Sequence, residues 1–598
     1  MPEFQTIPEL FHHRISATPN GTAFSYPEGG GWKSLTWKEF GDKVKQASMG
    51  LRSMGLSNEQ RVAILAGTRL DWIVADLGIL CGGGATTTIY PQSTPEDCAY
   101  IINDSGTVFC IAENDDQVKK LLEVRGQMPG LKNVITIDGK KSDDGFVITW
   151  AELLEKGKSA SQADWETIGK SVKGDSLATL IYTSGTTGKP KGVELLHDCW
   201  VFEGEAIDKM GLLRPDDVQL FWLPLAHSFG KVLEAAQLRI GFQTAIDGRV
   251  DKLVENLGVV KPTFVAAVPR VFEKVYNKVI AGPKAEGGLK YSIFKWAIEV
   301  GKEAGVLKQK KQSVGGLLGL KVKLADKLVY SKLKQRFGGK LRYFVSGSAP
   351  LSREIAEFFH ACDVLILEGY GLTESSAASF VNRPGDYEFG TVGPPLPGVE
   401  VKIASDGEIL IKSRGVMRGY HGLTEATGDT LKDGWLLTGD IGEMTPGGKL
   451  RITDRKKDLI KTSGGKYVAP QTIEGKMKVI CPFVSNAVVH GNNRNFCTML
   501  IALDPEAITE WARANGINGD YSAIVKDQKV HALIKPYIDQ LNGGLANYES
   551  IKKFAILPKD LTIDDGDLTP SQKVKRKVVE TKYKDVLDGF YSGALAEG

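Results

Sequence analysis

The chain has 598 residues, more than one hydrophobic core usually organises, so two or more domains are expected. Hydrophobic residues make up 42% and charged residues 25%, which is ordinary globular usage and leaves no segment polar enough to be a disordered domain. The formal net charge is only +3 and no aromatic-interleaved basic motif occurs, so we expect no nucleic-acid partner and favour a small-molecule one.

Cysteines and termini bear on the cellular compartment. The 7 cysteines are odd in number, scattered and never spaced as C-x-x-C, which argues against a disulfide framework and against a zinc cluster. The N-terminal segment lacks a basic stretch followed by an apolar run, so no secretory signal is expected. The most apolar region, residues 62–80, is interrupted by Thr68, Arg69 and Asp71 and is not a spanning helix. We therefore predict a cytoplasmic protein, with any membrane contact peripheral.

The first third of the chain alternates two kinds of segment. Residues 37–54 and 115–128 have the apolar spacing of amphipathic helices, whereas residues 61–65, 108–112 and 133–137 are short runs rich in β-branched side chains. This alternation predicts βαβ units, with parallel sheets buried between helices.

The texture of the sequence changes from about Val399. Shorter apolar runs are separated there by Asp-Gly and Pro-Gly-Gly turns, which favours a more antiparallel module that closes a large N-terminal domain. The last clear boundary is the charged cluster at residues 454–458. We predict an N-terminal domain over residues 1–456 and a C-terminal domain over residues 457–598.

One region is strongly basic. Residues 284–340 contain 14 Lys and Arg against 4 Asp and Glu, a net charge of +10 on a stretch with helical spacing. The plainer interpretation is a set of solvated lysines on surface helices. The alternative is a docking face for anionic lipid headgroups, which basic amphipathic helices favour.

The strongest local signal lies at residues 180–193, where an apolar strand runs into a loop dense in Gly, Ser and Thr with two lysines. Glycines let backbone N–H groups approach phosphate, hydroxyls donate hydrogen bonds, and Lys189 and Lys191 offset negative charge. The loop is not a Walker A motif, because Pro190 follows the Gly188-Lys189 pair where Ser or Thr is required. The alternative is an ordinary surface turn.

This loop, YTSGTTGKPKG at residues 182–192, resembles the signature loop of the adenylate-forming superfamily, which includes acyl-CoA synthetases, peptide-synthetase adenylation domains and luciferases. Further motifs of that superfamily follow in its order. They are RYFVSGSAP at 342–350, LEGYGLTES at 367–375, WLLTGD at 435–440, DRKKDLI at 454–460 and LTPSQKVKR at 568–576. The resemblance covers nearly the whole chain. It implies an α/β fold, with parallel-rich sheets and a distorted β-barrel-like module in the large domain and a small, mobile α+β C-terminal domain.

The resemblance also implies ATP, Mg²⁺ and coenzyme A as cofactors. Tyr370 would stack on adenine, Thr373 would contact phosphate, and Glu374 would hold Mg²⁺, which prefers carboxylate, water and phosphate oxygens. Asp440 would accept hydrogen bonds from both ribose hydroxyls, and Arg455 would also contact the ribose. The residues implied to contact the nucleotide or coenzyme are Thr183, Ser184, Gly185, Thr186, Thr187, Lys191, Gly347, Ser348, Ala349, Glu368, Gly369, Tyr370, Gly371, Thr373, Asp440, Arg455, Lys457 and Gly464.

The catalytic lysine of the superfamily falls on Lys573, which would bridge the substrate carboxylate and the α-phosphate. The sequence departs from the usual S-G-K form here, because Gln572 stands in place of glycine. Lys575 and Lys577 lie close by and are alternative candidates.

Four other positions complete the implied machinery. Thr187 belongs to the phosphate loop, and His227 would gate the approach of the acyl and pantetheine groups; the alternative for His227 is a structural histidine. Lys457 would be the hinge between domains, and Gly464 would line a narrow pantetheine channel after the hinge has turned.

Within the superfamily, PLAHSFG at 224–230, VPRVFEKV at 268–275 and the insertion at 284–340 resemble the long-chain fatty acid branch. That resemblance implies a ligase that converts a fatty acid and ATP to acyl-AMP and pyrophosphate, and then forms acyl-CoA and AMP. The alternatives are a fatty acyl-AMP ligase that delivers to a carrier-protein thiol, a non-catalytic lipid-binding scaffold and a luciferase-type oxygenase.

Overall fold

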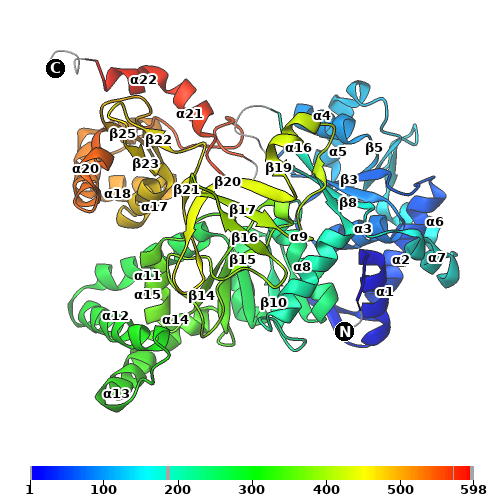
Figure 1. Cartoon of the computed structure of the whole chain (residues 1–598), viewed down its shortest axis with the longest axis horizontal. Coiled ribbons are helices and arrows are strands. Elements are labelled where there is room, and N and C mark those ends of the chain that lie inside the picture. The colour runs from blue at the N-terminus through cyan, green and yellow to red at the C-terminus, as the bar shows by residue number, and fades with distance from the viewer. Residues whose placement is uncertain (1–2, 184–188, 570–571, 593–598) are drawn as a thin grey trace.

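The computed structural model describes residues 3–183, 189–569 and 572–592 (Figure 1). It has the α/β fold that the sequence predicts, with parallel-rich sheets, an antiparallel module and a C-terminal α+β part. No helix in these residues is both long and apolar enough to cross a bilayer. The 7 cysteines of the chain all lie in the described residues, where each is free and buried.

The first large sheet has the strand order β18-β9-β8-β4-β3-β5-β6-β7. Its strands are β3 (Arg61–Leu65), β4 (Ala85–Ile89), β5 (Thr107–Ala112), β6 (Asn133–Thr136), β7 (Val147–Thr149), β8 (Leu177–Thr183), β9 (Lys191–Leu196) and β18 (Gly419–Tyr420). Pairing is parallel from β8 to β7 and antiparallel at β9 and β18. The short β-branched runs therefore form the buried centre of a parallel sheet, as predicted.

The second large sheet has the order β15-β14-β13-β12-β10-β11-β1-β2. Its strands are β1 (Thr22–Glu28), β2 (Gly31–Thr36), β10 (Val218–Phe221), β11 (Gln243–Ile246), β12 (Phe264–Ala267), β13 (Tyr343–Ser346), β14 (Ile366–Tyr370) and β15 (Phe380–Val381). The run from β14 to β1 is parallel, and the two edge strands are antiparallel.

Helices cover these sheets. They are α1 (Ile7–Ala17), α2 (Trp37–Ser53), α3 (Leu70–Cys81), α4 (Pro95–Ser105), α5 (Asp115–Glu123), α6 (Trp150–Gly157), α7 (Gln162–Ser171), α8 (His197–Lys209), α9 (Ser228–Ile240), α10 (Leu253–Val260) and α15 (Arg353–Ala361). Helix α3 is buried at every position except Asp71, because nearly all its side chains are apolar. Helix α2 begins where Thr36 and Glu39 form a capping box. Helix α5 ends at Glu123, whereas the sequence predicts a helix that continues to residue 128. The difference arises because Gly126 favours the turn that follows the helix.

The basic insertion forms a helical projection beside the second sheet (Figure 1). It comprises α11 (Pro269–Glu286), α12 (Gly288–Gln309), α13 (Gly316–Ala325), a π-helical turn (Asp326–Tyr330) and α14 (Ser331–Arg336). In Figure 1, α13 lies at the tip, at the end of the molecule away from the C-terminal segment.

The antiparallel module follows as predicted from the change at Val399. It contains β16 (Glu400–Ile403), β17 (Glu408–Lys412), β19 (Leu431–Lys432), β20 (Trp435–Met444) and β21 (Leu450–Arg455), and α16 (Thr424–Thr430) precedes β19. All pairings of this sheet are antiparallel. In Figure 1 its strands, in yellow, lie between the large sheets and the C-terminal part.

The C-terminal part has hydrophobic clusters of its own over residues 460–591. Its elements are β22 (Ile460–Lys461), β23 (Tyr467–Val468), α17 (Pro470–Ile480), β24 (Val484–His490), β25 (Cys497–Leu503), α18 (Pro505–Ala514), α19 (Tyr521–Ile524), α20 (Gln528–Asn542), β26 (Ile551–Ile556), α21 (Arg576–Lys582) and α22 (Lys584–Gly589). Strand β25 pairs with β24 antiparallel and with β26 parallel.

Candidate active site

The predicted site residues collect at the carboxyl ends of neighbouring strands in the second sheet. Strands β10, β12, β13 and β14 are parallel and adjacent, so their carboxyl ends meet at one edge. His227 follows β10, residues 347–349 follow β13, and Tyr370 ends β14. This edge is where open α/β sheets bind ligands.

His227 caps the N-terminus of α9, where its Nδ1 accepts a hydrogen bond from the backbone N–H of Phe229 at 3.1 Å. Burial, and then the positive charge of Lys573, lowers the pKa of His227 to about 3, so its imidazole is neutral at physiological pH. The next residue, Ser228, places its hydroxyl 3.3 Å from the hydroxyl of Thr373. The loop after β10 is thereby tied to the loop after β14.

The small residues after β13 are required by close packing. A Cβ on Gly347 would lie 3.1 Å from the ring of Phe229, and Ser348 adopts a left-handed backbone with φ of 68°. A side chain larger than hydrogen at 347 would push the aromatic ring of the His227 loop. Ala349 continues this loop before α15.

The motif in β14 is held mainly by backbone contacts. Glu368 is buried, which raises the pKa of its carboxyl to about 8, although the backbone of Leu351 and Gly390 acts in the opposite direction. Its predicted nucleotide contact stays a prediction. A Cβ on Gly371 would lie 1.5 Å from the carbonyl oxygen of Ala377, so only glycine fits there. A Cβ on Gly369 would lie 3.2 Å from the carbonyl oxygen of Phe380.

Three of the predicted nucleotide-binding side chains contact one another. The hydroxyl of Tyr370 donates to Oδ2 of Asp440 at 2.6 Å, and Nε of Arg455 lies 3.2 Å from Oδ1. Asp440 and Arg455 are also paired across β20 and β21. Burial raises the pKa of Asp440, whereas Arg455 and the Tyr370 hydroxyl act in the opposite direction. An acceptor carboxylate, an aromatic ring and a guanidinium are thus assembled at one place, a chemistry suited to a nucleoside.

Glu374 presents a carboxylate beside these groups. Its Oε1 accepts a hydrogen bond from the hydroxyl of Tyr420 at 2.8 Å, and the ammonium of Lys191 lies 4.9 Å from the centre of the Tyr420 ring. Within the described residues, no three His, Cys, Asp or Glu side chains cluster as a metal site. A single carboxylate nevertheless fits Mg²⁺, which usually keeps several waters and binds through one or two carboxylates plus substrate phosphates.

Lys573 reaches this site from the C-terminal part. Its side chain keeps solvent-accessible surface, but surrounding protein is dense enough that burial lowers the pKa of its ammonium to about 8. Arg455 lowers the pKa further, while Asp440 and Glu374 raise it. Together with its effect on the pKa of His227, this places the charge of Lys573 among the groups of the sheet edge.

The loop that carries Lys573 is a tight turn. The backbone N–H of Thr569 donates to the carbonyl of Lys573 at 2.8 Å, and Leu568 forms an antiparallel bridge with Val574. Gln572 adopts φ of 61°, in the left-handed region that glycine occupies at least cost. The departure from S-G-K noted in the sequence therefore falls on a position where the backbone favours glycine.

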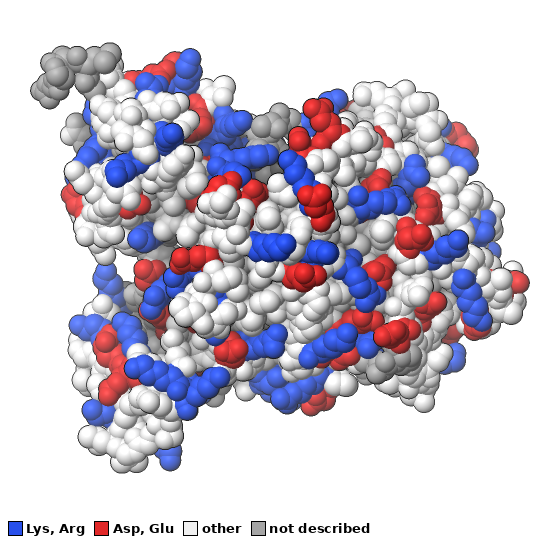
Figure 2. Space-filling view, in the orientation of Figure 1, with Lys and Arg blue, Asp and Glu red and all other residues white. Residues whose placement is uncertain are grey.

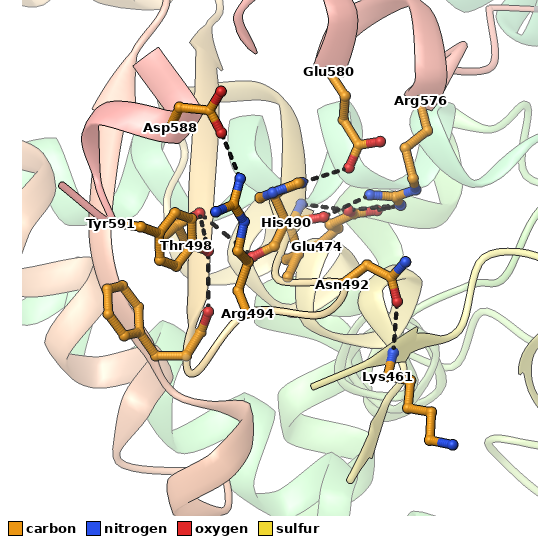
Figure 3. A network of polar contacts seen from close by, with 12 residues as sticks. Lys461, Glu474, His490, Asn492, Arg494, Thr498, Arg576, Glu580, Asp588 and Tyr591 are labelled. Carbon is orange, nitrogen blue, oxygen red and sulfur yellow. Dashed lines mark hydrogen bonds and ion pairs between the residues drawn. The ribbon is translucent and has the colours of Figure 1, made fainter. Parts of the chain in front are cut away.

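Arg576 and Glu474 fasten this turn to the C-terminal sheet (Figure 3). One terminal nitrogen of Arg576 contacts both carboxylate oxygens of Glu474 at 2.8 and 2.9 Å, and the other donates to the carbonyl of Val489 at 2.9 Å. Glu474 also accepts from the backbone N–H of Val489 at 2.7 Å. Arg576 is three residues after Lys573, so this half-buried pair supports the base of the loop that carries Lys573.

Other contacts in Figure 3 hold the last two helices and Tyr591 against β24 and the loop between β24 and β25. His490 lies 2.9 Å from Glu580 on α21, and Arg494 lies 2.5 Å from Asp588 on α22. The hydroxyl of Tyr591 donates to the carbonyl of Phe496 at 3.0 Å. These contacts all lie within the C-terminal part.

The predicted hinge and coenzyme residues lie in turns at the start of the C-terminal part. Lys457 is exposed in the turn after β21, and Gly464 is exposed in the hairpin between β22 and β23. Gln471 donates to Asp458 at 3.0 Å across this crossing. The predicted roles of Lys457 and Gly464 stay predictions.

The phosphate loop is described only at its ends. Thr183 ends β8 and Lys191 begins β9, and the two pair in the sheet. Ser184, Gly185, Thr186 and Thr187 lie outside the described residues, so their predicted roles stay predictions.

Sequence reasoning missed Tyr420, Glu474 and Arg576. Tyr420 is 46 residues from its partner Glu374, and Glu474 is 102 residues from Arg576. No local pattern pairs residues at such separations. The one available signal was the arginine at the end of the 568–576 motif, which the sequence alone gave no reason to pair with a glutamate.

Comparisons with known proteins agree with this geometry. The model of the AMP-binding enzyme family matches residues 11–421, and the model of the AMP-binding enzyme C-terminal domain matches residues 457–595. Among solved structures, the adenylation domain of a carboxylate reductase from Mycobacterium chelonae has a TM-score of 0.75 at 20% identity, covering 99% of this chain and 92% of that one. The anthranilate CoA ligase AuaEII in complex with anthranoyl-AMP has a TM-score of 0.71 at 19% identity, covering 98% and 99%. These likenesses show the fold.

Curated relatives match at higher identity. The long-chain-fatty-acid–CoA ligase FadD15 of Mycobacterium bovis is 37% identical over 94% of this chain and 93% of its own length. The long-chain-fatty-acid–CoA ligase ACSBG2 of Xenopus laevis is 32% identical over 98% of this chain and 84% of its own. With both family models matched in order along the chain, this protein belongs to the AMP-binding enzyme family.

Proposed function

We propose that the protein is a long-chain fatty acid–CoA ligase that works through an acyl-adenylate. The observation that carries the proposal is the assembly of Tyr370, Asp440 and Arg455 at the sheet edge. The charges of Lys573, from the C-terminal part, and of Glu374 act on Asp440. The relatives named above support the choice of acid, since both are called long-chain-fatty-acid–CoA ligases.

In the first half-reaction, a carboxylate oxygen of the fatty acid attacks the α-phosphorus of ATP. The bond from that phosphorus to the bridging oxygen breaks, and pyrophosphate leaves with the electron pair. Such a step gains most from positioning and charge neutralisation. Tyr370 and Asp440 would orient the nucleoside, and the Lys573 ammonium would offset charge on the α-phosphate and the carboxylate. Glu374 would hold Mg²⁺, which supplies further charge neutralisation when bound.

In the second half-reaction, the sulfur of coenzyme A attacks the acyl carbon and AMP leaves. We propose that the part beyond residue 456 first turns about Lys457, so that Lys573 withdraws and the hairpin with Gly464 takes its place. This uses the exposure of both Lys457 and Gly464 in the present pose. The neutral imidazole of His227, which lies in the loop after β10, would control the access of the thiol to the acyl carbon.

No protein thiol is needed as an acyl carrier. Each of the 7 cysteines is buried, and burial raises the pKa of every one of them. A thiol held neutral and out of solvent is a poor nucleophile. The acceptor is therefore external, and coenzyme A is the one we propose.

We also propose a cytoplasmic location with peripheral membrane contact through the basic region at residues 284–340. Free, buried cysteines suit a reducing compartment. The net charge of +10 on this region suits an anionic surface.

The test is pyrophosphate release from purified protein with ATP, Mg²⁺ and straight-chain acids from acetate to eicosanoate, with and without coenzyme A. We expect release to rise with long acids and to continue only when coenzyme A is present. A single burst that stalls despite coenzyme A would instead indicate a ligase that delivers to a carrier-protein thiol. Absence of acid-dependent release would overturn the proposed function.

A further inference from the structure

Helix α13 exposes a stripe of leucines. Leu317, Leu320 and Leu324 are 71%, 65% and 51% exposed, although leucine is usually buried. Their spacing of three and four residues places them on one face of the helix. The opposite face carries Leu318 and Val322, which pack against the protein core. The helix is therefore apolar on two sides, and one of these sides has no cover in the described chain.

The surroundings of this stripe are positively charged. Residues 304–325 contain five lysines, namely Lys308, Lys310, Lys311, Lys321 and Lys323, and no Asp or Glu. All five are exposed. In Figure 2 the tip at the lower left shows an uncharged surface flanked by blue side chains. The same tip is α13 in Figure 1, where it projects beyond the neighbouring helices.

An apolar stripe bordered by cations on a projecting helix matches one kind of surface. A bilayer with anionic headgroups offers phosphate and carboxylate groups for the lysines and acyl chains for the leucines. Helices of this type lie in the plane of the interface with their apolar face buried. A second copy of this chain fits less well, because it would bring the same lysines against one another.

We propose that α13 is an interfacial anchor that inserts Leu317, Leu320 and Leu324 into an anionic bilayer while the flanking lysines contact headgroups. The inference deepens the peripheral contact proposed above and rests on that part of the proposed function, not on the catalytic chemistry. It changes the expected mode of contact from a purely electrostatic one to insertion. The anchor brings the protein to the phase in which long-chain acids reside.

The first experiment is flotation of the full-length protein with phosphatidylcholine vesicles, with or without phosphatidylserine, at low and high salt. The triple variant Leu317→Gln, Leu320→Gln and Leu324→Gln should weaken partitioning onto serine-containing vesicles on the order of 100-fold. The pair Lys321→Gln and Lys323→Gln should weaken it about fivefold per lysine at low salt. Glutamine keeps good helix propensity, so folding should be preserved. The matched control is Leu122→Gln with Leu423→Gln, two leucines that are 42% and 41% exposed outside the insertion.

A second experiment measures insertion directly. Because the native cysteines are buried, a Leu320→Cys variant can be labelled selectively with an environment-sensitive fluorophore. We expect a blue shift on serine-containing vesicles, and quenching by spin labels on the upper acyl chain. Leu122→Cys, labelled in the same way, should not respond.

The outcomes separate the proposals. If the leucine variant still binds vesicles and the label at position 320 shows no blue shift, the peripheral contact is upheld and insertion is overturned. Absence of binding to any vesicle overturns both, whereas acid-dependent pyrophosphate release would still uphold the ligase. If the leucine variant changes the oligomeric state by light scattering and leaves vesicle binding intact, the stripe is a contact between copies and the anchor is wrong.

Discussion

The edge of the second sheet and the loop of Lys573 both position polar or charged groups for the proposed reaction, but the two regions are held in place by different contacts. At the sheet edge, Tyr370 and Asp440 are buried or half-buried and hold each other by a hydrogen bond. The Lys573 loop is an exposed turn held by Arg576 and Glu474 inside its own half of the protein. Direct hydrogen bonds between the halves include that from Arg270 to the carbonyl of Ser485, at 3.1 Å, and that from the backbone N–H of Gln471 to Asp454, at 3.3 Å. In the mechanism proposed above, one set of groups is fixed in advance and the other is delivered.

This difference suits a reaction in two steps. Groups that bind the nucleotide are needed in both half-reactions, so their rigid placement does not hinder the second one. Under the proposed function, the charge of Lys573 serves adenylation and would obstruct the approach of the thiol, so it is expected on a part that can leave. Substitutions at the fixed edge should therefore impair both half-reactions, and those in the delivered loop should impair the first alone.

Removal of the Lys573 ammonium should have the largest effect. Lys573→Ala is expected to slow adenylation about 10²- to 10³-fold, as for loss of a preorganised oxyanion donor. Thioester formation from a preformed acyl-adenylate should change little. Single-turnover measurements of the two half-reactions give both rates, and Lys577→Ala is the matched control. Equal loss in both half-reactions would contradict the delivered role.

The pH dependence sharpens the same point. With a pKa of about 8, Lys573 loses its proton as pH rises through that value. The kcat/KM for adenylation, which reports on free enzyme, should therefore decline above pH 8, whereas the charge is fully present at lower pH. Lys573→Arg should lack this alkaline limb, because guanidinium stays protonated. An unchanged limb in that variant would assign it to another group.

Glu374 tests the fixed edge. Glu374→Gln should raise the Mg²⁺ concentration needed for half-maximal adenylation roughly 10- to 100-fold, because an anionic ligand is lost. Tyr420→Phe removes only the hydrogen bond to that carboxylate and should have about a fivefold effect. Magnesium titrations of pyrophosphate release give both values. A larger effect for Tyr420→Phe than for Glu374→Gln would remove Glu374 from the metal site.

The sequence predicts the residues of the sheet edge far better than it predicts the contacts that support the Lys573 loop. Strands such as residues 61–65 and the glycine-rich turns carry local signals, namely alternation, β-branching and tight packing, and the structure confirms the fold that they predict. The neighbouring positions of Tyr370, Asp440 and Arg455 follow from motif order. The bond from Arg576 to Glu474 joins residues 102 apart, and only packing in three dimensions decides it. The electrostatic link of Lys573 to Arg455, Asp440 and Glu374 is likewise a property of the assembled halves.

The Arg576–Glu474 pair should act on adenylation through the position of Lys573. Glu474→Gln keeps the shape of the side chain but removes its charge, and we expect about a tenfold slower adenylation, with thioester formation spared. In a double-mutant cycle with Lys573→Ala, the two effects should not add, since the second change has no lysine left to position. Additive losses, or equal losses in both half-reactions, would reduce the pair to a structural role.

Gln572 offers the smallest and most specific test of the delivered loop. Its φ of 61° costs a non-glycine residue about 1–2 kcal/mol of folding free energy, which glycine would avoid. Glycine also makes the unfolded chain more flexible, and this offsets about 0.5–1 kcal/mol of that stabilisation. Gln572→Gly should therefore stabilise the C-terminal part by about 0.5–1 kcal/mol, measured by denaturant unfolding, and Lys575→Gly should destabilise it. Because the turn already places Lys573 correctly, adenylation should change less than about threefold. A marked loss of adenylation in Gln572→Gly would mean that the glutamine side chain holds the turn in place. The less flexible backbone of glutamine would then be needed to position Lys573.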